Sequence, residues 1–235
     1  MITIIIPALN EEEYLPVLLK SIEEQGLKDY EIIVADAGSK DKTRHIAKSF
    51  GAKVVKGGLP AAGRNRGANA AKKELLLFLD ADVKLPKGFL KKTIDEFHKR
   101  KLDVATCFYK PQSRHLADHA IMNIMNVWTY LSQFFWPHAI GVCIFAKSDV
   151  HKKLNGFDET IKIAEDMDYV NRAGKIGKFR VMHAHHVLVS MRRYEKKGRL
   201  KMVISYLKGF FYRMLFGEIR DGKVMEYEFG KFKKK

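Results

Sequence analysis

The sequence contains little cysteine and no long uninterrupted apolar segment. Cys107 and Cys143 are the two cysteines in 235 residues, and each lies inside an apolar run. We therefore expect two buried free thiols rather than a disulfide framework, a zinc site or redox chemistry. An uncharged stretch at residues 120–136 is too short and too rich in Asn, Ser, Gln and Thr for a transmembrane helix. The chain starts directly in a predicted strand, without a signal-peptide pattern, so we expect a cytoplasmic protein.

Acidic residues are scarce relative to basic ones. The chain has 43 Lys and Arg against 27 Asp and Glu, a formal net charge of +16. Such an excess suits an anionic partner, namely nucleic acid, an acidic membrane face or a phosphorylated substrate, but it is also typical of a lysine-rich soluble surface. Much of the excess lies in the C-terminal third, including residues 231–235. Charge alone does not choose between these partners.

Strands and helices are predicted to alternate along most of the chain. Apolar, β-branched runs predict strands, and apolar residues at helical spacing predict the helices between them. The predicted strands cover residues 2–6, 31–35, 53–55, 75–79, 102–107 and 140–146, and a helix is predicted over residues 86–100. Strand, polar turn and helix in this order indicate right-handed βαβ units. The length of the chain fits one α/β domain, or one domain with an appendage.

The run at residues 75–79 stops abruptly at Asp80-Ala81-Asp82. Five apolar residues without alternation indicate a strand buried on both faces, as in a parallel sheet. The two acids then follow the carboxyl end of the strand, the edge at which open α/β sheets bind ligands. Because carboxylates two residues apart in an extended chain point the same way, Asp80 and Asp82 are candidate ligands of a divalent cation.

Residues 78–82 resemble the DXD motif of nucleotide-sugar glycosyltransferases, in particular family 2 with the GT-A fold. Three further segments resemble motifs of that family in the same order along the chain. Residues 6–11 resemble its P-x-x-N-E opening, residues 36–43 its D-D-G-S-x-D-x-T turn with Ala37 in place of the second acid, and residues 61–71 its A-R-N-x-G element. The resemblance implies a Rossmann-like, doubly wound, mostly parallel mixed sheet flanked by helices.

The resemblance also implies which residues bind the nucleotide sugar. They are Pro7, Ala8, Asn10, Glu11, Asp36, Gly38, Ser39, Arg64, Asp80 and Ala81. A carboxylate can accept a hydrogen bond from a ribose hydroxyl or a uracil N–H, which favours Asp36. For Asn10 and Asp41 the interpretation as helix caps is favoured. For Arg64 the alternative to nucleotide binding is a solvated surface arginine, and nucleotide binding is favoured.

A second group of acids follows at residues 155–172. Gly156-Phe157-Asp158-Glu159 and Glu165-Asp166-Met167-Asp168 resemble the family's G-F-D-E and E-D-x-D-L-x-x-R region, with Tyr169 where leucine is usual. The resemblance implies that Asp166 is the general base of an inverting transfer and deprotonates the acceptor hydroxyl. Glu165 ranks second for this role, because an acid at a helix start can instead stabilise the first turn.

Residues 182–194 contain three histidines followed by two arginines. Some GT-A enzymes take a third metal ligand from a histidine, and His185 is the candidate here. Alternation along a strand would place His183 and His185 on one face and His186 on the other. Residues 190–194 loosely resemble the Q-x-x-R-W motif, which makes Arg192 and Arg193 candidates to neutralise the leaving diphosphate.

Two segments have an amphipathic or uncharged character. Residues 120–136 are interpreted as either a core helix or an interfacial helix. Residues 199–216 place apolar side chains on one stripe and lysines on the other side. This pattern is typical both of a helix on an acidic lipid surface and of a helix docked on its own domain. We expect a glycosyltransferase domain at residues 1–198 and a basic amphipathic helix and tail at residues 199–235.

The predicted function is a metal-dependent, inverting glycosyltransferase. It would use Mn²⁺ or Mg²⁺ and a UDP- or GDP-sugar, with an acceptor hydroxyl or phosphate that is lipid-linked or soluble. We expect peripheral contact with the inner face of the cell membrane and no nucleic-acid partner. One alternative is a nucleotidyltransferase, although the N-terminal loop lacks the glycine-rich, basic sequence usual there. The other is a non-catalytic membrane- or nucleic-acid-binding module, in which clustered carboxylates would repel phosphate.

Overall fold

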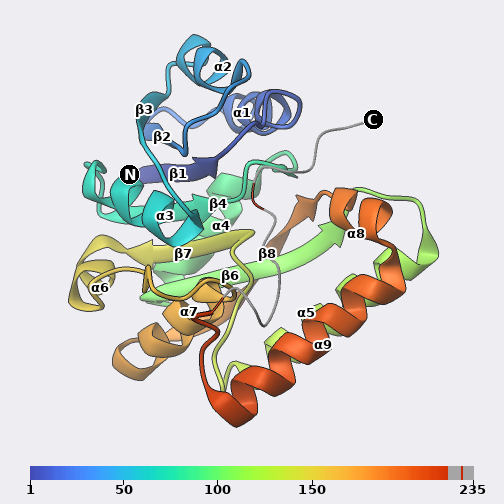
Figure 1. Cartoon of the computed structure of the whole chain (residues 1–235). Coiled ribbons are helices and arrows are strands. Elements are labelled where there is room, and N and C mark those ends of the chain that lie inside the picture. The colour runs from blue at the N-terminus through green and yellow to red at the C-terminus, as the bar shows by residue number, and fades with distance from the viewer. Residues whose placement is uncertain (222–228, 230–235) are drawn as a thin grey trace.

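The centre of the molecule is a mixed sheet with the strand order β3-β2-β1-β4-β7-β6-β8-β5 (Figure 1). The computed structural model describes residues 1–221 and Phe229; the predicted basic tail at residues 231–235 lies outside the described residues. The strands are β1 (Ile2–Ala8), β2 (Tyr30–Asp36), β3 (Lys53–Lys56), β4 (Leu75–Leu79), β5 (Val83–Lys84), β6 (Val104–Pro111), β7 (Cys143–Lys147) and β8 (Phe179–Val189).

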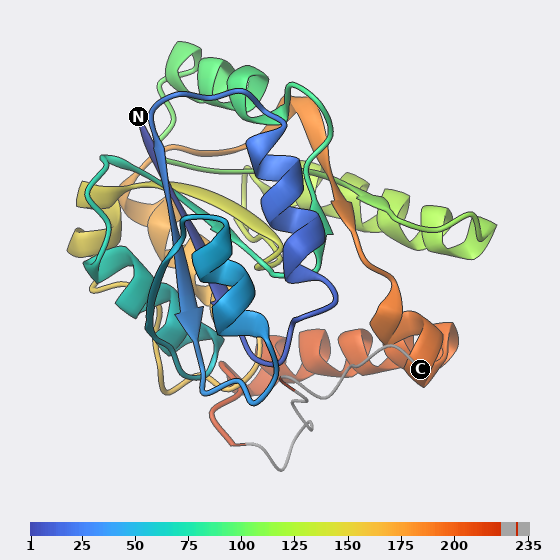
Figure 2. The same ribbon diagram turned by 90° about the horizontal axis from the view of Figure 1, so that it is seen from above.

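Helices connect the strands and cover both faces of the sheet (Figures 1 and 2). They are α1 (Leu15–Glu23), α2 (Thr43–Ser49), α3 (Pro60–Asn69), α4 (Phe89–Lys99), α5 (Leu116–Ser132), α6 (Ser148–Lys153), α7 (Glu165–Ile176), α8 (Arg192–Lys197) and α9 (Arg199–Phe216). Apolar side chains of α1 and α4 pack on one face, and those of α3, α6 and α7 on the other.

The first four strands along the sheet, β3, β2, β1 and β4, are all parallel. Strands β1 and β4 are buried along their whole length, as their continuous apolar sequences predict. Helix α3 lies close to β1 because its interior positions are small. A Cβ added at Gly67 would lie 2.3 Å from Cγ2 of Ile5, and one at Gly63 would lie 3.1 Å from Cβ of Pro7. This close packing brings the side chains of α3 to the carboxyl edge of the parallel strands.

The other half of the sheet is mixed. Strand β7 is antiparallel to both β4 and β6, β8 is parallel to β6, and the short β5 is antiparallel to β8. The predicted strand at 140–146 begins three residues later, at Cys143, and the predicted helix at 86–100 begins at Phe89, after Gly88 in the left-handed conformation. Strand β8 carries a bulge, because Cys107 pairs with Met182 but Phe108 pairs with His186.

This bulge contains His183, Ala184 and His185. The Glu96 carboxylate on α4 accepts hydrogen bonds from the backbone N–H groups of His183 at 2.9 Å and Ala184 at 2.7 Å. These bonds satisfy two backbone N–H groups that, because of the bulge, do not pair with β6 in the sheet. The simple alternation predicted for the three histidines is therefore wrong.

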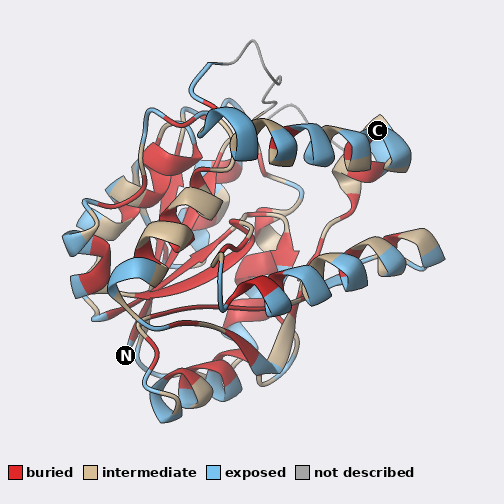
Figure 3. Ribbon diagram, turned by 90° about the horizontal axis from the view of Figure 1, so that it is seen from below, coloured by how far each residue is buried: buried red, intermediate tan, exposed pale blue. Residues whose placement is uncertain are grey.

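Helices α5 and α9 lie across the lower face of the molecule (Figure 3). Helix α5 is not a core helix, since Ile124 is 70% and Leu131 54% exposed, so that alternative is wrong. Helix α9 is held at both ends. Arg199 at its start pairs with Asp118 of α5, and the chain after it returns to form a bridge between Ile219 and Ile163. Within residues 1–221, no helix is long and apolar enough to cross a bilayer.

Candidate functional site

The carboxyl ends of three parallel strands bring the first sequence motifs together. Pro7 lies opposite Ala35 and Ala8 opposite Asp36, where β1 and β2 end side by side. Strand β4, on the other side of β1, ends one residue before Asp80. Ala81 in the following turn is buried. The strand topology therefore assembles these candidates at one edge of the sheet, as the βαβ pattern predicts.

The loops after β1 and β2 are interlocked. Oδ1 of Asn10 accepts a hydrogen bond from the backbone N–H of Lys40 at 2.9 Å, and the Asn10 N–H donates to Oγ of Ser39 at 2.9 Å. The Glu11 N–H donates to Oγ1 of Thr43 at 2.8 Å. Asn10 has a left-handed backbone with φ of 55°. Helix α1 starts at Leu15, so the interpretation of Asn10 as its N-cap is wrong; its side chain joins two loops instead.

The Asp36 carboxylate is buried inside its own turn. Its Oδ1 accepts hydrogen bonds from the N–H groups of Gly38 and Ser39, both at 3.1 Å. Nε of Arg44 lies 3.7 Å from the same oxygen. Gly38 has φ of 94°, which a glycine adopts without steric cost. The turn thus fixes the direction of Asp36 at the end of β2.

Arg64 on α3 is the centre of one ionic cluster. Its Nη1 donates to Oε1 of Glu165 at 2.7 Å, and its Nη2 to Oδ1 of Asp80 at 2.9 Å. The Arg64 side chain is only 3% exposed, so the alternative of a surface arginine is wrong. One guanidinium therefore connects α3, the end of β4 and the start of α7.

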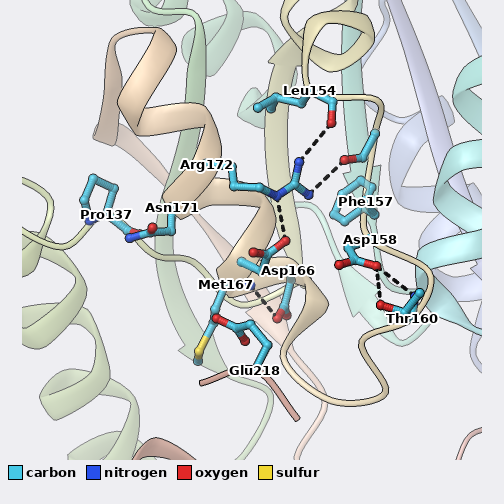
Figure 4. Close-up of polar contacts among 12 residues, drawn as sticks. Pro137, Leu154, Phe157, Asp158, Thr160, Asp166, Met167, Asn171, Arg172 and Glu218 are labelled. Carbon is cyan, nitrogen blue, oxygen red and sulfur yellow. Dashed lines mark hydrogen bonds and ion pairs between the residues drawn. The ribbon is translucent and has the colours of Figure 1, made fainter. Parts of the chain in front are cut away.

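Asp166 lies next to this cluster at the start of α7. Its carboxylate accepts a hydrogen bond from the backbone N–H of Gly141. It also accepts one from the backbone N–H of Met167 at 2.8 Å (Figure 4). A Cβ at position 141 would lie 2.2 Å from Nη2 of Arg64 and 3.0 Å from Oδ2 of Asp166. Glycine is thus the residue that lets the backbone approach both charged groups.

Burial controls the protonation of the two neighbouring acids. It raises the pKa of Asp166 above its usual range, against the attraction of Arg64. Burial, together with the negative charge of Asp166, raises the pKa of Glu165 to about 7, although Arg64 lowers it. Such a value lies close to physiological pH, where a carboxylate can both take up and release a proton.

Two side chains hold the loop before α7. Oδ1 of Asn65 accepts from the Phe157 N–H at 2.8 Å, while its Nδ2 donates to the Phe157 carbonyl at 2.9 Å. Arg172 donates to the carbonyls of Leu154 at 3.0 Å and Gly156 at 2.9 Å (Figure 4). The asparagine beside Arg64 and the arginine of α7 therefore position the G-F-D-E segment.

Arg192 on α8 is the centre of a second ionic cluster. Its two terminal nitrogens donate to the two carboxylate oxygens of Glu11 at 2.8 and 2.7 Å. Its Nε lies 2.8 Å from Oδ2 of Asp82, and its guanidinium lies over the Tyr14 ring at 4.3 Å. Burial raises the pKa of Glu11 to about 7 and raises the pKa of Asp82 as well. The positive charge of Arg192 opposes the rise at both acids but does not cancel it. The positive charge of Arg193 lowers the pKa of Asp82 as well.

The two acids of the DXD-like segment thus take different arginines, Asp80 with Arg64 and Asp82 with Arg192. His185 does not join them: a ring nitrogen lies 3.2 Å from the Lys87 carbonyl. Within residues 1–221 and Phe229, no group of three His, Cys, Asp or Glu side chains could hold a metal ion. The oxygen ligands that Mg²⁺ and Mn²⁺ prefer are present as the two carboxylates of Asp80 and Asp82, which remain the candidate ligands.

Two further residues near the start of α7, His138 and Arg213, were missed by sequence reasoning. Burial lowers the pKa of His138, and the positive charge of Arg213 on α9 lowers it further. The negative charge of Asp166 acts in the opposite direction. Tyr206 on α9 is 44% exposed, and its ring lies 6.2 Å from that of Tyr194. On the same helix, Nη1 of Arg213 lies 3.0 Å from Sδ of Met167, the residue after Asp166. Helix α9 therefore lies beside the start of α7. The signal in the sequence was weak: the histidine follows a proline, and the arginine lies in an amphipathic helix.

Comparisons with known proteins identify the family and the fold of the chain. The family model described as "Glycosyl transferase family 2" matches residues 3–155, more than half of the chain. The 4,4'-diaponeurosporenoate glycosyltransferase of Staphylococcus haemolyticus is 35% identical over 54% of this chain and 37% of its own length. The GalNAc(5)-diNAcBac-PP-undecaprenol beta-1,3-glucosyltransferase of Campylobacter jejuni is 34% identical over 38% of this chain and 32% of its own length. The chain thus spans about a third of these relatives.

Solved structures share the fold at lower identity. The mannosyltransferase PcManGT of Pyrobaculum calidifontis, in complex with GDP-Man and Mn²⁺, has a TM-score of 0.69 at 18% identity, over 88% of this chain and 64% of that one. S. aureus TarS 1-349 in complex with UDP-GlcNAc has a TM-score of 0.65 at 21% identity, over 80% of this chain and 58% of that one. The predicted fold class, a GT-A sheet with flanking helices, is confirmed.

Proposed function

Since the chain belongs to glycosyltransferase family 2 and is a glycosyltransferase, we propose that it transfers a sugar from a nucleotide-diphosphate sugar in one inverting displacement. The acceptor is a hydroxyl or phosphate group. Membership of this family sets aside both a nucleotidyltransferase and a non-catalytic module. Residues 1–198 form the proposed glycosyltransferase domain, and residues 199–235 the proposed helix and tail.

The donor side of the proposed site is the edge formed by β1, β2 and β4. Asp36 accepts a hydrogen bond from the ribose or base, with Gly38 and Ser39 holding its turn. Pro7 and Ala8 line the nucleotide from β1, and Asn10 fixes the loop that faces it. This role is supported by the position of the strand ends, at the edge where open sheets bind nucleotides.

Asp82, assisted by Asp80, would hold Mn²⁺ or Mg²⁺ at the donor diphosphate. The bound cation would offset negative charge on the departing nucleotide. Arg192 is paired with Asp82 and Glu11, and Arg193 lies near enough to act on the pKa of Asp82. We assign these two arginines to the diphosphate, since a guanidinium binds phosphate oxygens through parallel hydrogen bonds. His185 is no longer favoured as a ligand, because it lies against Lys87 and Phe89.

Asp166 is the proposed general base. It takes the proton of the acceptor nucleophile as the sugar's anomeric carbon forms its new bond and releases the nucleotide diphosphate. The Gly141 N–H holds its carboxylate, and burial raises its pKa toward the range in which a base works at neutral pH. Glu165 is the second candidate, but its bond to Arg64 suits a positioning role better.

The proposed acceptor is lipid-linked. One relative carries an undecaprenol-linked acceptor in its name, and the side of the site beyond Asp166 is bordered by aromatic residues, with Trp128 and Trp136 both against Phe210. Such an acceptor resides in a bilayer, so we place the enzyme in the cytoplasm at the inner face of the membrane. A soluble acceptor is the competing possibility for the test.

The observation that carries the proposal is the single Arg64 guanidinium between Asp80 on the donor side and Glu165, the neighbour of Asp166. The first test is a thermal-shift screen with UDP-, GDP- and dTDP-sugars, with and without Mn²⁺ or Mg²⁺. We expect one nucleotide class to stabilise the protein, and only with metal. Nuclear magnetic resonance of the product then reports whether the anomeric configuration is inverted. No stabilisation by any nucleotide sugar, or a retained configuration, would contradict the proposal.

A further inference from the structure

Helix α5 turns its polar residues toward the protein. The buried Asp118 carboxylate accepts from Nε and Nη2 of Arg199 at 2.7 and 2.9 Å. Asn126 accepts from the Tyr109 N–H at 2.9 Å and donates to its carbonyl at 2.8 Å. Each of these bonds fixes the rotation of the helix about its axis. The polar face of α5 is therefore held inward by specific partners.

The outward face of α5 and of the turn after it is apolar. Its most exposed apolar side chains are Leu116, Ile124, Val127, Trp128, Leu131, Phe134 and Phe135. Asn123 is exposed among them. The sequence has no Lys, Arg, Asp or Glu between residues 119 and 146, and the charge at the edge of this face is that of Arg180, which lies 5.1 Å from the Phe134 ring. A helix on a water-facing surface has the opposite arrangement, with charged residues outside. We call the seven apolar residues the α5 face.

Helix α9 repeats the pattern. Its buried positions are Met202 and Gly209. Its exposed apolar residues, at helical spacing, are Leu200, Ile204, Leu207, Phe211, Met214, Leu215 and Phe216. Exposed Lys201 and Lys208 flank this row, which we call the α9 face. Both helices lie across the same lower side of the molecule (Figure 3).

We propose that the α5 face and the α9 face together dock the protein on an anionic bilayer surface, with both helices lying in the interface. Exposed apolar surface of this extent marks an interaction site. The apolar rows would enter the boundary between headgroups and acyl chains, and the flanking lysines would contact anionic headgroups.

The positive charge of the protein favours an anionic membrane, rather than a second copy of the chain, as the partner of these two faces. Two copies joined through these faces would bring together the lysines of two chains, each with a net charge of +16. An anionic bilayer instead neutralises them. Aromatic side chains among the exposed residues, Trp128 and Phe135 for example, are also typical of a membrane interface.

Docking would also fix which side of the active site faces the bilayer, and this step rests on the proposed function. Nη1 of Arg213 on α9 lies 3.0 Å from Sδ of Met167, the residue that follows the proposed base Asp166. Docking through these two helices therefore turns the acceptor side of the site to the bilayer. The donor edge, formed by β1, β2 and β4, stays on the part of the molecule that carries α1 and α2 (Figure 1).

Vesicle flotation of the full chain tests the docking. Vesicles of phosphatidylcholine alone are compared with an equal mixture of phosphatidylcholine and phosphatidylglycerol, in low and high salt. We expect flotation with the anionic vesicles and a weaker association as salt rises. We also expect the double variants Ile124→Ser/Leu131→Ser and Leu207→Ser/Phe211→Ser each to lower partitioning by about tenfold or more, because these side chains would leave an apolar environment.

Val17→Ser is the matched control, since Val17 is an exposed apolar residue on α1 and should leave flotation unchanged. Absence of flotation under all conditions would overturn the proposal, as would a wild-type dimer in solution that becomes monomeric in the double variants. Nucleotide-sugar binding is measured on the same samples. Donor binding without flotation would overturn the docking alone, and flotation without donor binding would overturn the proposed function alone.

Discussion

Helices α4 and α5 both flank the same sheet but bury opposite kinds of residue. Helix α4 buries Phe89, Leu90, Thr93, Ile94 and Phe97 and exposes its lysines. Helix α5 buries Asp118, Met122, Thr129 and Ser132 and exposes Ile124 and Leu131. Of these two helices, only α4 has the charged outer surface that is typical of a helix in contact with water. Burial of the apolar face stabilises the fold at α4. At α5, the polar bonds of Asp118 and Asn126 add to the packing of Met122 against the core, and a row of apolar side chains stays exposed.

The two ionic clusters follow a similar division. Arg192 joins Glu11 and Asp82, next to the strand ends that we assign to the donor. Arg64 joins Asp80 and Glu165, next to the base that we assign to the acceptor. Changes on the donor side should therefore act on nucleotide-sugar binding, and changes on the acceptor side on transfer or on membrane docking. A variant on one side that alters the function assigned to the other side would contradict this division.

Removal of the metal ligand should have the largest effect on the donor side. Asp82→Asn removes a negative charge that would bind the cation, and we expect both turnover and metal-dependent donor binding to fall by roughly 100-fold or more. Isothermal titration calorimetry with the preferred nucleotide sugar and Mn²⁺ measures the second effect. Chelation of the metal should reproduce it in the wild type. Asp149→Asn, on the exposed helix α6, is the control, and undiminished turnover with excess chelator would contradict the assignment.

Two isoleucines compare the helices directly. Ile94 on α4 is buried, whereas Ile124 on α5 is 70% exposed. Ile94→Ala should lower the free energy of unfolding by about 2–5 kcal/mol through lost burial and a residual cavity. Ile124→Ala should change it by less than about 0.5 kcal/mol. Urea denaturation followed by circular dichroism measures both values, and equal losses would show that the α5 face is ordinary core.

We expect the loss of activity at low pH to come from the two acids on the acceptor side, Asp166 and Glu165. Burial raises the pKa of Asp166 above its usual range and that of Glu165 to about 7. Because a general base must be ionised, kcat/KM should fall by about tenfold per pH unit below the pKa of this pair. Glu165→Gln leaves Asp166 to titrate without a second carboxyl group, so the proton that the coupled pair retains up to about pH 7 is lost and the fall should move to lower pH. A profile that stays in place would contradict the coupling.

The same raised pKa has a defined effect on stability. Folded Glu165 keeps a proton up to about pH 7, whereas the unfolded chain releases it near pH 4.5. Between these values the folded state binds more protons, so this group lowers the free energy of unfolding as pH rises. Its stabilising contribution is fully present below about pH 4.5 and is lost as pH passes 7. Denaturation of wild type and Glu165→Gln across this range should show a smaller pH dependence in the variant.

The sequence predicted the donor half of the fold well because the signals there are local. Consecutive apolar residues before Asp80 identify a buried strand, and alternating strands and helices bring Asp36 and Ala8 to the same edge. Pairing over long separations could not be predicted, as in the contact of Arg192 with Glu11. The bulge at His183–His185 depends on Glu96, which is 87 residues away from His183 in sequence.

Helical periodicity also has a limit that α5 and α9 expose. It predicts which residues share a face, and the row that includes Leu200, Ile204, Leu207 and Phe211 was recognised from spacing alone. It does not predict whether that face turns inward, because this depends on partners such as Tyr109 for Asn126. The position of α9 beside the start of α7, through Arg213 and Met167, likewise required the tertiary structure.

The central claim is that Asp166 acts on the acceptor and not on the donor. The most direct test measures nucleotide-sugar affinity and transfer on the same preparation of Asp166→Asn. We predict that transfer falls by about 100- to 10,000-fold while donor affinity stays within about twofold of wild type, because the residue acts only on the nucleophile. A parallel loss of donor affinity would contradict the claim and would move Asp166 to the nucleotide side.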